Sequence, residues 1–173
     1  MGDTKGRIAG EMFPIKPPAF AAWRPPVEQI VQDTTDRQMR GIVIRPVMVY
    51  GRKAGLIGAF VSGKMPFVGD GSNHWSFVHV DDLGDLYALA VAKAPAGSLY
   101  LAAVGKALKV RDVAQAAGIT SFLPAEEARA KMGPMVDGLV LDQQIGSTRA
   151  SRELGWRPKG PTVLDEIRRG YFS

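Results

Sequence analysis

A run of β-branched residues, Gly41-Ile-Val-Ile-Arg45 closed by Pro46, constrains the fold of this chain more than any other segment. A continuous apolar run of this kind is typical of a strand that is covered on both faces in a parallel sheet. Parallel strands need long crossover connections, which are usually helices. Since helical and strand patterns alternate through the first two thirds of the chain, the sequence predicts the α/β class.

The residues around this strand predict where other elements begin and end. Prolines crowd the first 25 residues. Because proline is best tolerated in the first turn of a helix, we expect a helix to begin near Trp23–Pro26 and to run toward Thr35. Apolar and polar residues alternate from Trp75 to Asp81, which predicts a second strand. Asp81 or Asp82 would cap the helix that follows. Helices are expected over residues 54–63, 83–93, 110–117, 124–132, 134–144, 150–154 and 162–171, and a further strand over 98–104.

The composition limits the class of protein. The chain has 173 residues, of which 46% are apolar, so it can bury one core as a single domain. It has no cysteine, which excludes disulfides, cysteine-ligated zinc or iron–sulfur sites, and a thiol nucleophile. No apolar stretch approaches the roughly 18 residues of a membrane span, and the polar start Met1–Gly6 lacks a signal core. We therefore expect a soluble, cytoplasmic protein without a membrane partner.

The net charge of +5 suggests an anionic partner such as nucleic acid. The basic residues, however, are scattered singly or in pairs such as Arg52-Lys53 and Arg168-Arg169, without the aromatic interleaving of a nucleic-acid surface. We therefore expect no nucleic-acid partner. A mild preference for anionic ligands, including a phosphorylated cofactor, is compatible with this charge.

Three glycines follow the first strand with the spacing Gly51-x-x-x-Gly55-x-x-Gly58. Glycines there would let the backbone approach a phosphate, and Asp70 farther along would hold a ribose hydroxyl. The spacing, however, does not match the G-x-G-x-x-G pattern, and Asp70 lies in a glycine-rich turn. Two interpretations stay open: a dinucleotide-binding loop, or a loop in which the glycines are incidental.

His79 and Asp81 project to the same face of the strand expected over residues 75–81. One interpretation is a general base that is oriented by a carboxylate. The other is a core histidine bound to a nearby backbone group, with an aspartate that caps the following helix. His74 lies among turn residues and is expected at the surface.

Other kinds of site find little support among the residues. The two histidines and the aspartates at positions 70, 81 and 82 match no ligand spacing, so no metal is expected. No G-x-S-x-G elbow is present, which leaves a hydrolase triad without support. A metal-free hydrolase or lyase that uses His79 and Asp81 is the remaining alternative of this kind.

Four segments resemble motifs of one family, in that family's order. Gly41 to Gly51 resembles the "RPxxVYG" strand and loop of extended short-chain dehydrogenase/reductases, the NAD-dependent epimerase/dehydratase family. Trp75 to Leu83 resembles its "FVHVDDL" element, and two later segments resemble its closing "LGW.P" and "ei..G", at residues 152–158 and 165–170. The resemblance implies NAD or NADP as the cofactor.

The resemblance covers nearly the whole chain but only the second half of the family. It implies one domain with a partial Rossmann-like parallel sheet, as in the C-terminal half of an extended short-chain dehydrogenase, and a small α+β substrate-binding part. Residues 1–52 would be a remnant of the Rossmann half, and residues 53–173 the substrate-side half with the terminal helices. On this alignment the family's nucleotide-binding glycines and its catalytic Ser/Thr are missing.

The family's Tyr-x-x-x-Lys pair is altered in this chain. In the family the tyrosine is the acid/base, and the lysine lowers its pKa and holds the nicotinamide ribose. The aligned stretch here is Phe20-Ala-Ala-Trp-Arg24, with Glu28 at the position of the family's following glutamate. Phenylalanine cannot exchange a proton, whereas arginine stays protonated but can still hold a ribose or a phosphate. The resemblance therefore implies an atypical active site.

The resemblance also implies which residues surround the cofactor and the substrate. The expected catalytic residues are Arg24, Tyr50 and His79, with Tyr50 or His79 as the proton donor. The residues expected to bind the cofactor are Arg24, Pro46, Val47 and Val49, and those expected to bind the substrate are Tyr50, Arg52, Trp75 and Asp81.

These expectations support two main hypotheses. The first is an NAD(P)-dependent oxidoreductase or epimerase-like protein that acts on a small hydroxylated carbonyl or sugar-like compound. The alternative is a catalytically inactive, truncated family fragment that works as a binding or interaction module. Since an open half of a parallel sheet would expose strand edges, we expect a homo-oligomer or a complementing chain.

Overall fold

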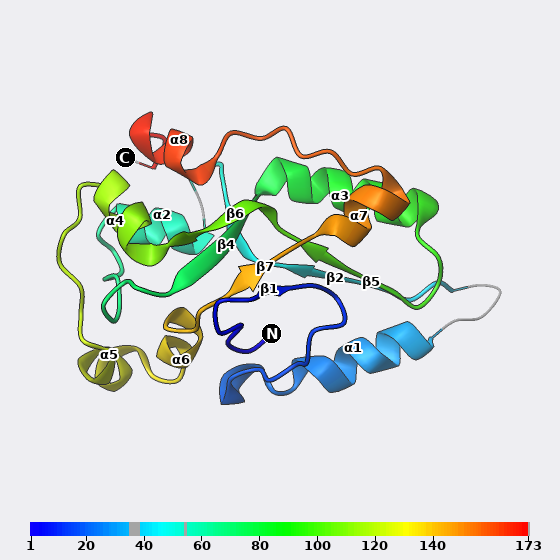
Figure 1. Ribbon diagram of the computed structural model, residues 1–173, viewed down its shortest axis with the longest axis horizontal. Coiled ribbons are helices and arrows are strands. Elements are labelled where there is room, and N and C mark those ends of the chain that lie inside the picture. Colours follow the sequence, from blue (N-terminus) through cyan, green and yellow to red (C-terminus); the bar gives the residue numbers. More distant parts are fainter. Residues whose placement is uncertain (35–38, 54, 173) are drawn as a thin grey trace.

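The computed structural model describes residues 1–34, 39–53 and 55–172 of the chain. Helices and strands alternate along it in the arrangement of Figure 1. The strands are β1 (Ile8–Ala9), β2 (Ile42–Pro46), β3 (Met48–Tyr50), β4 (His74–His79), β5 (Ser98–Ala102), β6 (Val104–Lys109) and β7 (Gln144–Ile145). The α-helices are α1 (Arg24–Asp33), α2 (Gly55–Val61), α3 (Val80–Lys93), α4 (Val110–Ala116), α5 (Ala125–Met132), α6 (Met135–Leu139), α7 (Thr148–Leu154) and α8 (Val163–Arg168).

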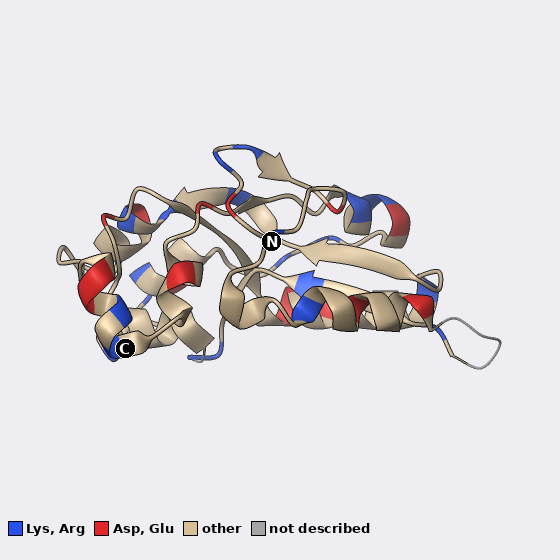
Figure 2. Cartoon of the chain, turned by 90° about the horizontal axis from the view of Figure 1, so that it is seen from below, with Lys and Arg blue, Asp and Glu red and all other residues tan. Residues whose placement is uncertain are grey.

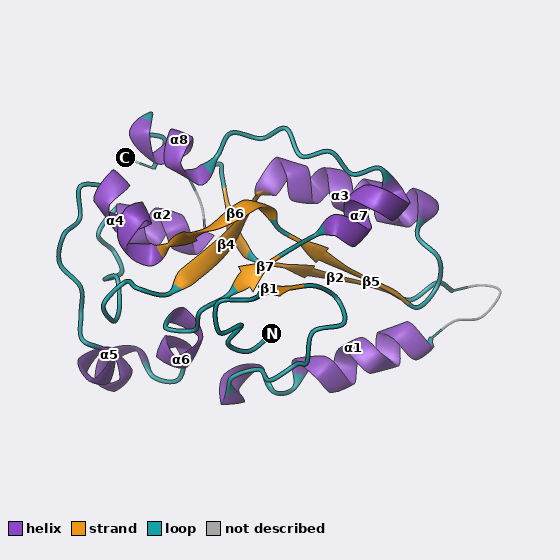
Figure 3. Ribbon diagram, viewed as in Figure 1, coloured by secondary structure: helices purple, strands orange, loops and turns teal. Residues whose placement is uncertain are grey.

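Parallel pairing predominates among these strands. β2 pairs in parallel with β5, with Val43 opposite Leu99, and β3 pairs in parallel with β4. β4 also pairs with β6 in the antiparallel direction, and β1 forms a short parallel pair with β7. Helices α3 and α7 lie on one face of the β2–β5 pair, and α1 lies on the other (Figure 3). The α/β class and the covered parallel strand that follows Gly41 are therefore confirmed.

Two expected elements differ most from the structure in their bounds. The helix expected over residues 134–144 ends at Leu139, because the Asn73 amide and the Trp75 indole donate hydrogen bonds to the Leu139 carbonyl oxygen. These side chains satisfy a backbone group at the helix end, and the chain then continues into β7. The strand expected over residues 98–104 is two strands, because β5 pairs with β2 whereas β6 pairs with β4. Thr35 and Ala54, the expected end of one helix and start of another, lie outside the described residues.

The start of α3 differs from the expectation as well. The strand β4 ends at His79, and the helix begins at Val80, so Asp81 is a helical residue and does not share a strand face with His79. The capping residue is His79, whose Nδ1 atom accepts the Asp81 backbone N–H at 3.2 Å. The expectation that Asp81 or Asp82 caps this helix is therefore wrong, since an imidazole nitrogen already satisfies the free amide of the first turn.

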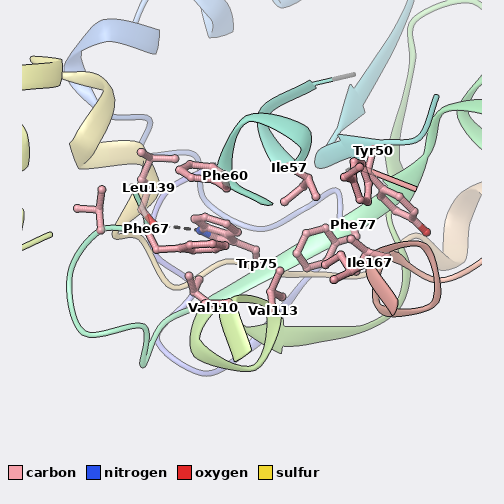
Figure 4. Packing of buried hydrophobic residues seen from close by; sticks show 14 of the residues in the cluster. Tyr50, Ile57, Phe60, Phe67, Trp75, Phe77, Val110, Val113, Leu139 and Ile167 are labelled. Atoms are coloured by element: carbon pink, nitrogen blue, oxygen red, sulfur yellow. Dashed lines mark hydrogen bonds between the residues drawn. The ribbon is translucent and has the colours of Figure 1, made fainter. Parts of the chain in front are cut away.

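Aromatic residues form the centre of the largest apolar core, between β3, β4 and β6 and the helices α2 and α4. Figure 4 shows Phe60, Phe67 and Trp75 packed against one another, with Ile57, Phe77 and Ile167 beside them. The Phe60 and Phe67 rings are stacked with their centroids 5.1 Å apart, and Trp75 lies 5.4 Å from Phe60. This packing fixes the face of the β3–β4–β6 sheet against the helices.

The charged residues are distributed over the whole molecule. In the view of Figure 2, lysines and arginines lie at both ends and in the middle, interspersed with acidic residues. No helix of the described residues is both long enough and apolar enough to cross a membrane.

Candidate functional site

A cavity of about 410 Å³ lies between α1, the carboxyl end of β2 and the segment 138–145. We call it the β2 cavity. Ligands of open α/β folds bind at the carboxyl ends of parallel strands, and small-molecule sites usually measure about 300–1,000 Å³. The lining includes four of the residues expected in a site, together with a buried arginine and its carboxylate partner: Arg24, Pro46, Val47, Trp75, Arg45 and Glu28.

The electrostatic centre of the β2 cavity is the pair of Arg45 and Glu28. Arg45 is on β2 and Glu28 on α1, which packs against that strand. The Arg45 Nε and Nη2 atoms both donate to Glu28 Oε2, at 2.8 and 2.6 Å. The third guanidinium nitrogen, Nη1, is buried and has no hydrogen-bond partner among the described residues. A buried N–H group without an acceptor is costly, and since Arg45 is a lining residue of the cavity, an acceptor atom of a ligand could satisfy it.

Phe20 and Arg24 lie at the rim of the β2 cavity. Phe20 is in a short 3-10 helix, Ala19–Ala21, and packs on Gly138, where an added Cβ would be only 3.0 Å from the phenylalanine Cζ. Arg24 begins α1 as expected, and its guanidinium lies 5.5 Å from the centre of the Trp23 ring. Phe20, the residue that the resemblance aligns with a tyrosine, thus lies in the lining of the cavity, and the described lining residues include no tyrosine.

Trp75 and Ser76 hold the opposite side of the β2 cavity in place. The Trp75 indole nitrogen donates to the Leu139 carbonyl oxygen at 3.0 Å, as Figure 4 shows. The Ser76 hydroxyl donates to the Gln143 carbonyl oxygen at 3.2 Å and accepts the Ile145 N–H at 2.9 Å. Trp75 thus lies in the lining, as the prediction of a substrate-side residue requires, but its polar atom is already bound within the protein.

Tyr50 lies outside the lining of the β2 cavity. Its hydroxyl donates to the Pro161 carbonyl oxygen at 2.6 Å, and its ring makes edge contacts with Phe77 and His79. Burial, and then the nearby negative charge of Glu166, raise the pKa of Tyr50 well above its ordinary value. A phenol that is neutral and already hydrogen-bonded is poorly placed to donate a proton to a ligand in this cavity.

His79 also lies outside that lining. It is buried, its Nδ1 accepts the Asp81 backbone N–H, and its Nε2 lies 3.1 Å from Glu166 Oε1. Because Nδ1 accepts a hydrogen bond, the proton of the neutral ring is on Nε2 and is donated to Glu166. The Asp81 carboxylate is 3.8 Å from Nδ1 and does not orient the ring. The contacts of His79 are those of the core-histidine alternative, with the imidazole ring as the cap.

The other expected substrate residues lie at the surface. Arg52 and Asp81 form an exposed ion pair, with Arg52 Nη2 2.6 Å from Asp81 Oδ1. Val49 packs into the second apolar cluster, under Val78 and Leu86, rather than in the lining of the cavity. The roles expected for these three residues stay predictions, and none of them touches the β2 cavity.

The structure accounts for the glycine at position 51 and for the contacts of Asp70. Gly51 has a φ of 117°, and a Cβ there would lie 2.8 Å from His79 Nε2. Asp70 accepts hydrogen bonds from the backbone N–H and the hydroxyl of Ser72, at 2.8 and 2.6 Å, and these bonds lower its pKa. One oxygen of the Asp70 carboxylate is thus bound inside its own turn, and the dinucleotide-loop interpretation stays a prediction.

Sequence reasoning missed two buried acids and misplaced one histidine. Asp82 accepts the backbone N–H groups of Lys159 and Gly160 at 2.7 and 3.0 Å, and Glu166 is the partner of His79. His74, expected at the surface, is partly buried with its Nδ1 2.6 Å from Asp142 Oδ1. The partners of Asp82 are far along the chain, so no local pattern predicts its role. The one signal for this residue is its place in the "FVHVDDL" element. The described residues contain no group of three or more potential metal ligands.

Residues 19–103 match the sequence model of the NAD dependent epimerase/dehydratase family. Among curated relatives, uncharacterized protein YLL056C of Saccharomyces cerevisiae is 26% identical over 159 residues, which are 83% of this chain and 52% of that protein. The 3-diazoavenalumate denitrifying reductase of Streptomyces sp is 25% identical over 164 residues, 88% of this chain and 54% of that protein. The chain thus spans about half the length of these relatives.

Solved structures share the fold. A double mutant of DesIV, a dTDP-glucose 4,6-dehydratase from Streptomyces venezuelae with NAD and DAU bound, matches with a TM-score of 0.77 and 22% identity. The match covers 99% of this chain and 56% of that one. RMD from Pseudomonas aeruginosa, complexed with NADPH, matches with a TM-score of 0.63 and 19% identity over 96% of this chain and 61% of that one. Residues 19–103 thus belong to the NAD dependent epimerase/dehydratase family, and the chain as a whole shares the Rossmann-like fold of these structures.

Proposed function

We propose that this chain forms the nicotinamide and substrate side of an NAD(P)-dependent oxidoreductase or epimerase-like protein, and that the β2 cavity is the binding site. The single observation that carries the proposal is Arg45, a lining residue of that cavity whose buried Nη1 has no hydrogen-bond partner among the described residues. Relatives and neighbours of the chain include a reductase and structures with NAD or NADPH bound, which supports the same cofactor class here.

The lining of the β2 cavity suits one end of a dinucleotide. Arg24 and Arg45 would donate to ribose hydroxyl or phosphate oxygens, while Pro46 and Val47 would contact the flat face of a nicotinamide ring. A nicotinamide cofactor bound there would supply or accept a hydride. The expected division of the chain into residues 1–52 and 53–173 stays a prediction. The strand β5, from the second of these parts, pairs with β2 from the first.

The substrate would be a small hydroxylated carbonyl or sugar-like compound. Its carbonyl oxygen would share Arg45 Nη1 with the cofactor, because that nitrogen carries two N–H groups and one of them can polarise the carbonyl. The reaction also needs a proton donor. Tyr50 and His79 keep that role only as a prediction, since both are bound elsewhere in the structure.

A second candidate function is a binding module without catalysis. The observation that favours it is Phe20 at the rim of the cavity, where the family resemblance implies a catalytic tyrosine. Among the described lining residues, Glu28 is the only carboxylic acid, and its carboxylate is held by Arg45. A protein of this kind would bind the dinucleotide and leave it unchanged.

Calorimetric titration with NADH and NADPH tests the proposal. We expect the chain to bind at least one of the two, and Arg45→Lys to weaken that binding about tenfold. Lysine keeps the charge beside Glu28 but lacks the planar fork with which arginine binds Glu28 through two nitrogens and keeps the third for a ligand. Arg168→Lys, a change at an exposed residue of α8, is the matched control and should leave the affinity unchanged. Absence of binding to both dinucleotides would overturn the proposal.

The two candidate functions differ in turnover. Oxidation of the bound reduced cofactor by small aldehydes, ketones or keto-sugars would support the oxidoreductase. The loss of the cofactor's absorbance measures this oxidation. Tight binding without any oxidation across such a panel supports the binding module.

A further inference from the structure

A second cavity, of about 690 Å³, lies between β6, β7 and α7, and we call it the α7 groove. It shares one lining residue, Ile145, with the β2 cavity and is otherwise built from different residues. Its volume is within the usual range of about 300–1,000 Å³ for small-molecule sites. No part of the proposed cofactor site uses it.

Three cationic side chains line the α7 groove: Lys106 on β6, Arg152 on α7, and Arg157 just beyond that helix. Within the described part of the chain, no carboxylate pairs with Lys106 or Arg157. Arg152 lies 3.4 Å from Glu153, but that carboxylate is bound mainly by Arg149, at 3.0 Å through both of its oxygens. The groove therefore has an uncompensated positive charge, which favours an anionic ligand.

Arg157 is held in position by the backbone. Its Nη1 donates to the carbonyl oxygens of Ser151 and Trp156, both at 3.1 Å, which leaves its other guanidinium N–H groups without a partner among the described residues. The hydroxyls of Thr148 and Ser151, also in the lining, make no hydrogen bond within that part of the chain. A fixed guanidinium beside free hydroxyls and a lysine is a donor set that matches the oxygens of a phosphate group.

The remaining surface of the groove is not a second anion site. His74, at its other end, is bound to Asp142, and that carboxylate also accepts the Gly6 N–H at 2.9 Å. Ile8, which is strongly exposed, and the small side chains of Ala103 and Ala107 add an apolar part to the lining. An apolar surface next to a phosphate-type donor set fits a ligand with an organic part as well as a phosphate.

We propose that the α7 groove binds a small organic phosphate, with the phosphate on Lys106, Arg152 and Arg157 and the organic part on the apolar surface around Ile8. This site is separate from the β2 cavity and does not depend on the function proposed for it. The ligand class includes nucleoside monophosphates and sugar phosphates, which share the phosphate monoester.

A titration followed by amide NMR, with AMP and with inorganic phosphate as the probes, tests this site. We expect AMP to shift the amide signals of Lys106, Gly146 and Thr148 in a saturable manner, with an affinity several-fold higher than that of inorganic phosphate. The double substitution Lys106→Gln with Arg157→Gln should weaken AMP binding at these signals by tenfold or more. Added salt should weaken it as well, because the contact is electrostatic.

Two control variants keep the outcome clear. Lys64→Gln removes an exposed lysine outside the groove and should leave the AMP titration unchanged. Arg45→Lys alters the β2 cavity and should also leave these three signals unchanged, so failure of the cofactor proposal does not affect the result. The proposal is overturned if AMP shifts only signals of the β2 cavity, if AMP binds no better than phosphate, or if Lys64→Gln weakens binding as much as the double substitution.

Discussion

Asp142 connects three separate segments of the chain. Its carboxylate accepts the His74 ring N–H, the His74 backbone N–H at 2.8 Å and the Gly6 backbone N–H at 2.9 Å. Burial acts to raise its pKa, but the hydrogen bonds outweigh burial, so the pKa of Asp142 is lowered from its ordinary value. A carboxyl group whose folded pKa is lowered stabilises the fold above its unfolded pKa and loses this contribution as the pH falls through the folded value.

We therefore expect Asp142→Asn to destabilise the fold by about 1–3 kcal/mol near neutral pH, because an amide cannot replace the charged acceptor. The difference from the unchanged protein should shrink below about pH 4, where the aspartate itself becomes protonated. Urea unfolding at several pH values measures both effects. Asp112→Asn, at an exposed position of α4, is the matched control. An equal loss of stability at every pH would contradict the linkage.

At the scale of elements, the first turn of α3 binds the chain segment that follows α7. The Asp82 carboxylate accepts two backbone N–H groups from that segment, and the Trp156 indole donates to the Asp82 carbonyl oxygen at 2.8 Å. Gly160 approaches so closely that an added Cβ would lie 2.8 Å from Asp82 Oδ2 and from the His79 ring. Helix α3 thus holds this segment through one buried carboxylate and one close backbone contact.

Two glycine-to-alanine substitutions separate this contact from helix propensity. Gly160→Ala should destabilise the fold by about 1–3 kcal/mol, because the methyl group overlaps buried atoms. Gly84→Ala, in the middle of α3 with no atom within 4 Å of the added Cβ, should stabilise it by about 0.5–1 kcal/mol. Urea unfolding of both variants gives the comparison. A Gly160→Ala protein as stable as the original would show that the segment is free to move away from Asp82.

At the scale of the whole molecule, α1 has an apolar face that the chain itself does not cover. The apolar side chains of Trp23, Val27 and Ile30 are exposed and follow one another at helical spacing, with Trp23 at the N-cap position of α1. No residue of α1 is fully buried. The homo-oligomer stays a prediction, and this stripe is the surface through which we expect it to form, since an amphipathic helix is stabilised by burying its apolar face.

Light scattering after size-exclusion chromatography tests this expectation. We expect the chain to elute with the mass of a dimer or larger, and Ile30→Lys to shift the protein toward the monomer because a charge would be buried in the contact. Val91→Lys makes the same change at an exposed apolar position of α3 and should leave the mass unchanged. A monomer at all concentrations would exclude self-association through α1.

Local patterns predicted much of the fold. The β-branched run before Pro46 became β2, the prolines at 25 and 26 occupy the first turn of α1, and Thr162 caps α8 by accepting the Asp165 N–H. Each of these depends on neighbours within a few residues, and short-range sterics and hydrogen bonding decide them. The bounds of α6 were missed because Asn73 and Trp75, more than sixty residues away, donate to its last carbonyl group.

The sequence by itself determined the α/β class, the parallel strand β2 and the motifs that identify the family. The tertiary structure alone decided which side chains share a site. It paired Arg45 with Glu28 and left one guanidinium nitrogen buried without a partner among the described residues. It also bound Tyr50 to Pro161, which is 111 positions away in the chain, and His79 to Glu166, which is 87 positions away. The physical reason is that burial and hydrogen-bond satisfaction are properties of the packed fold, and no local pattern contains them.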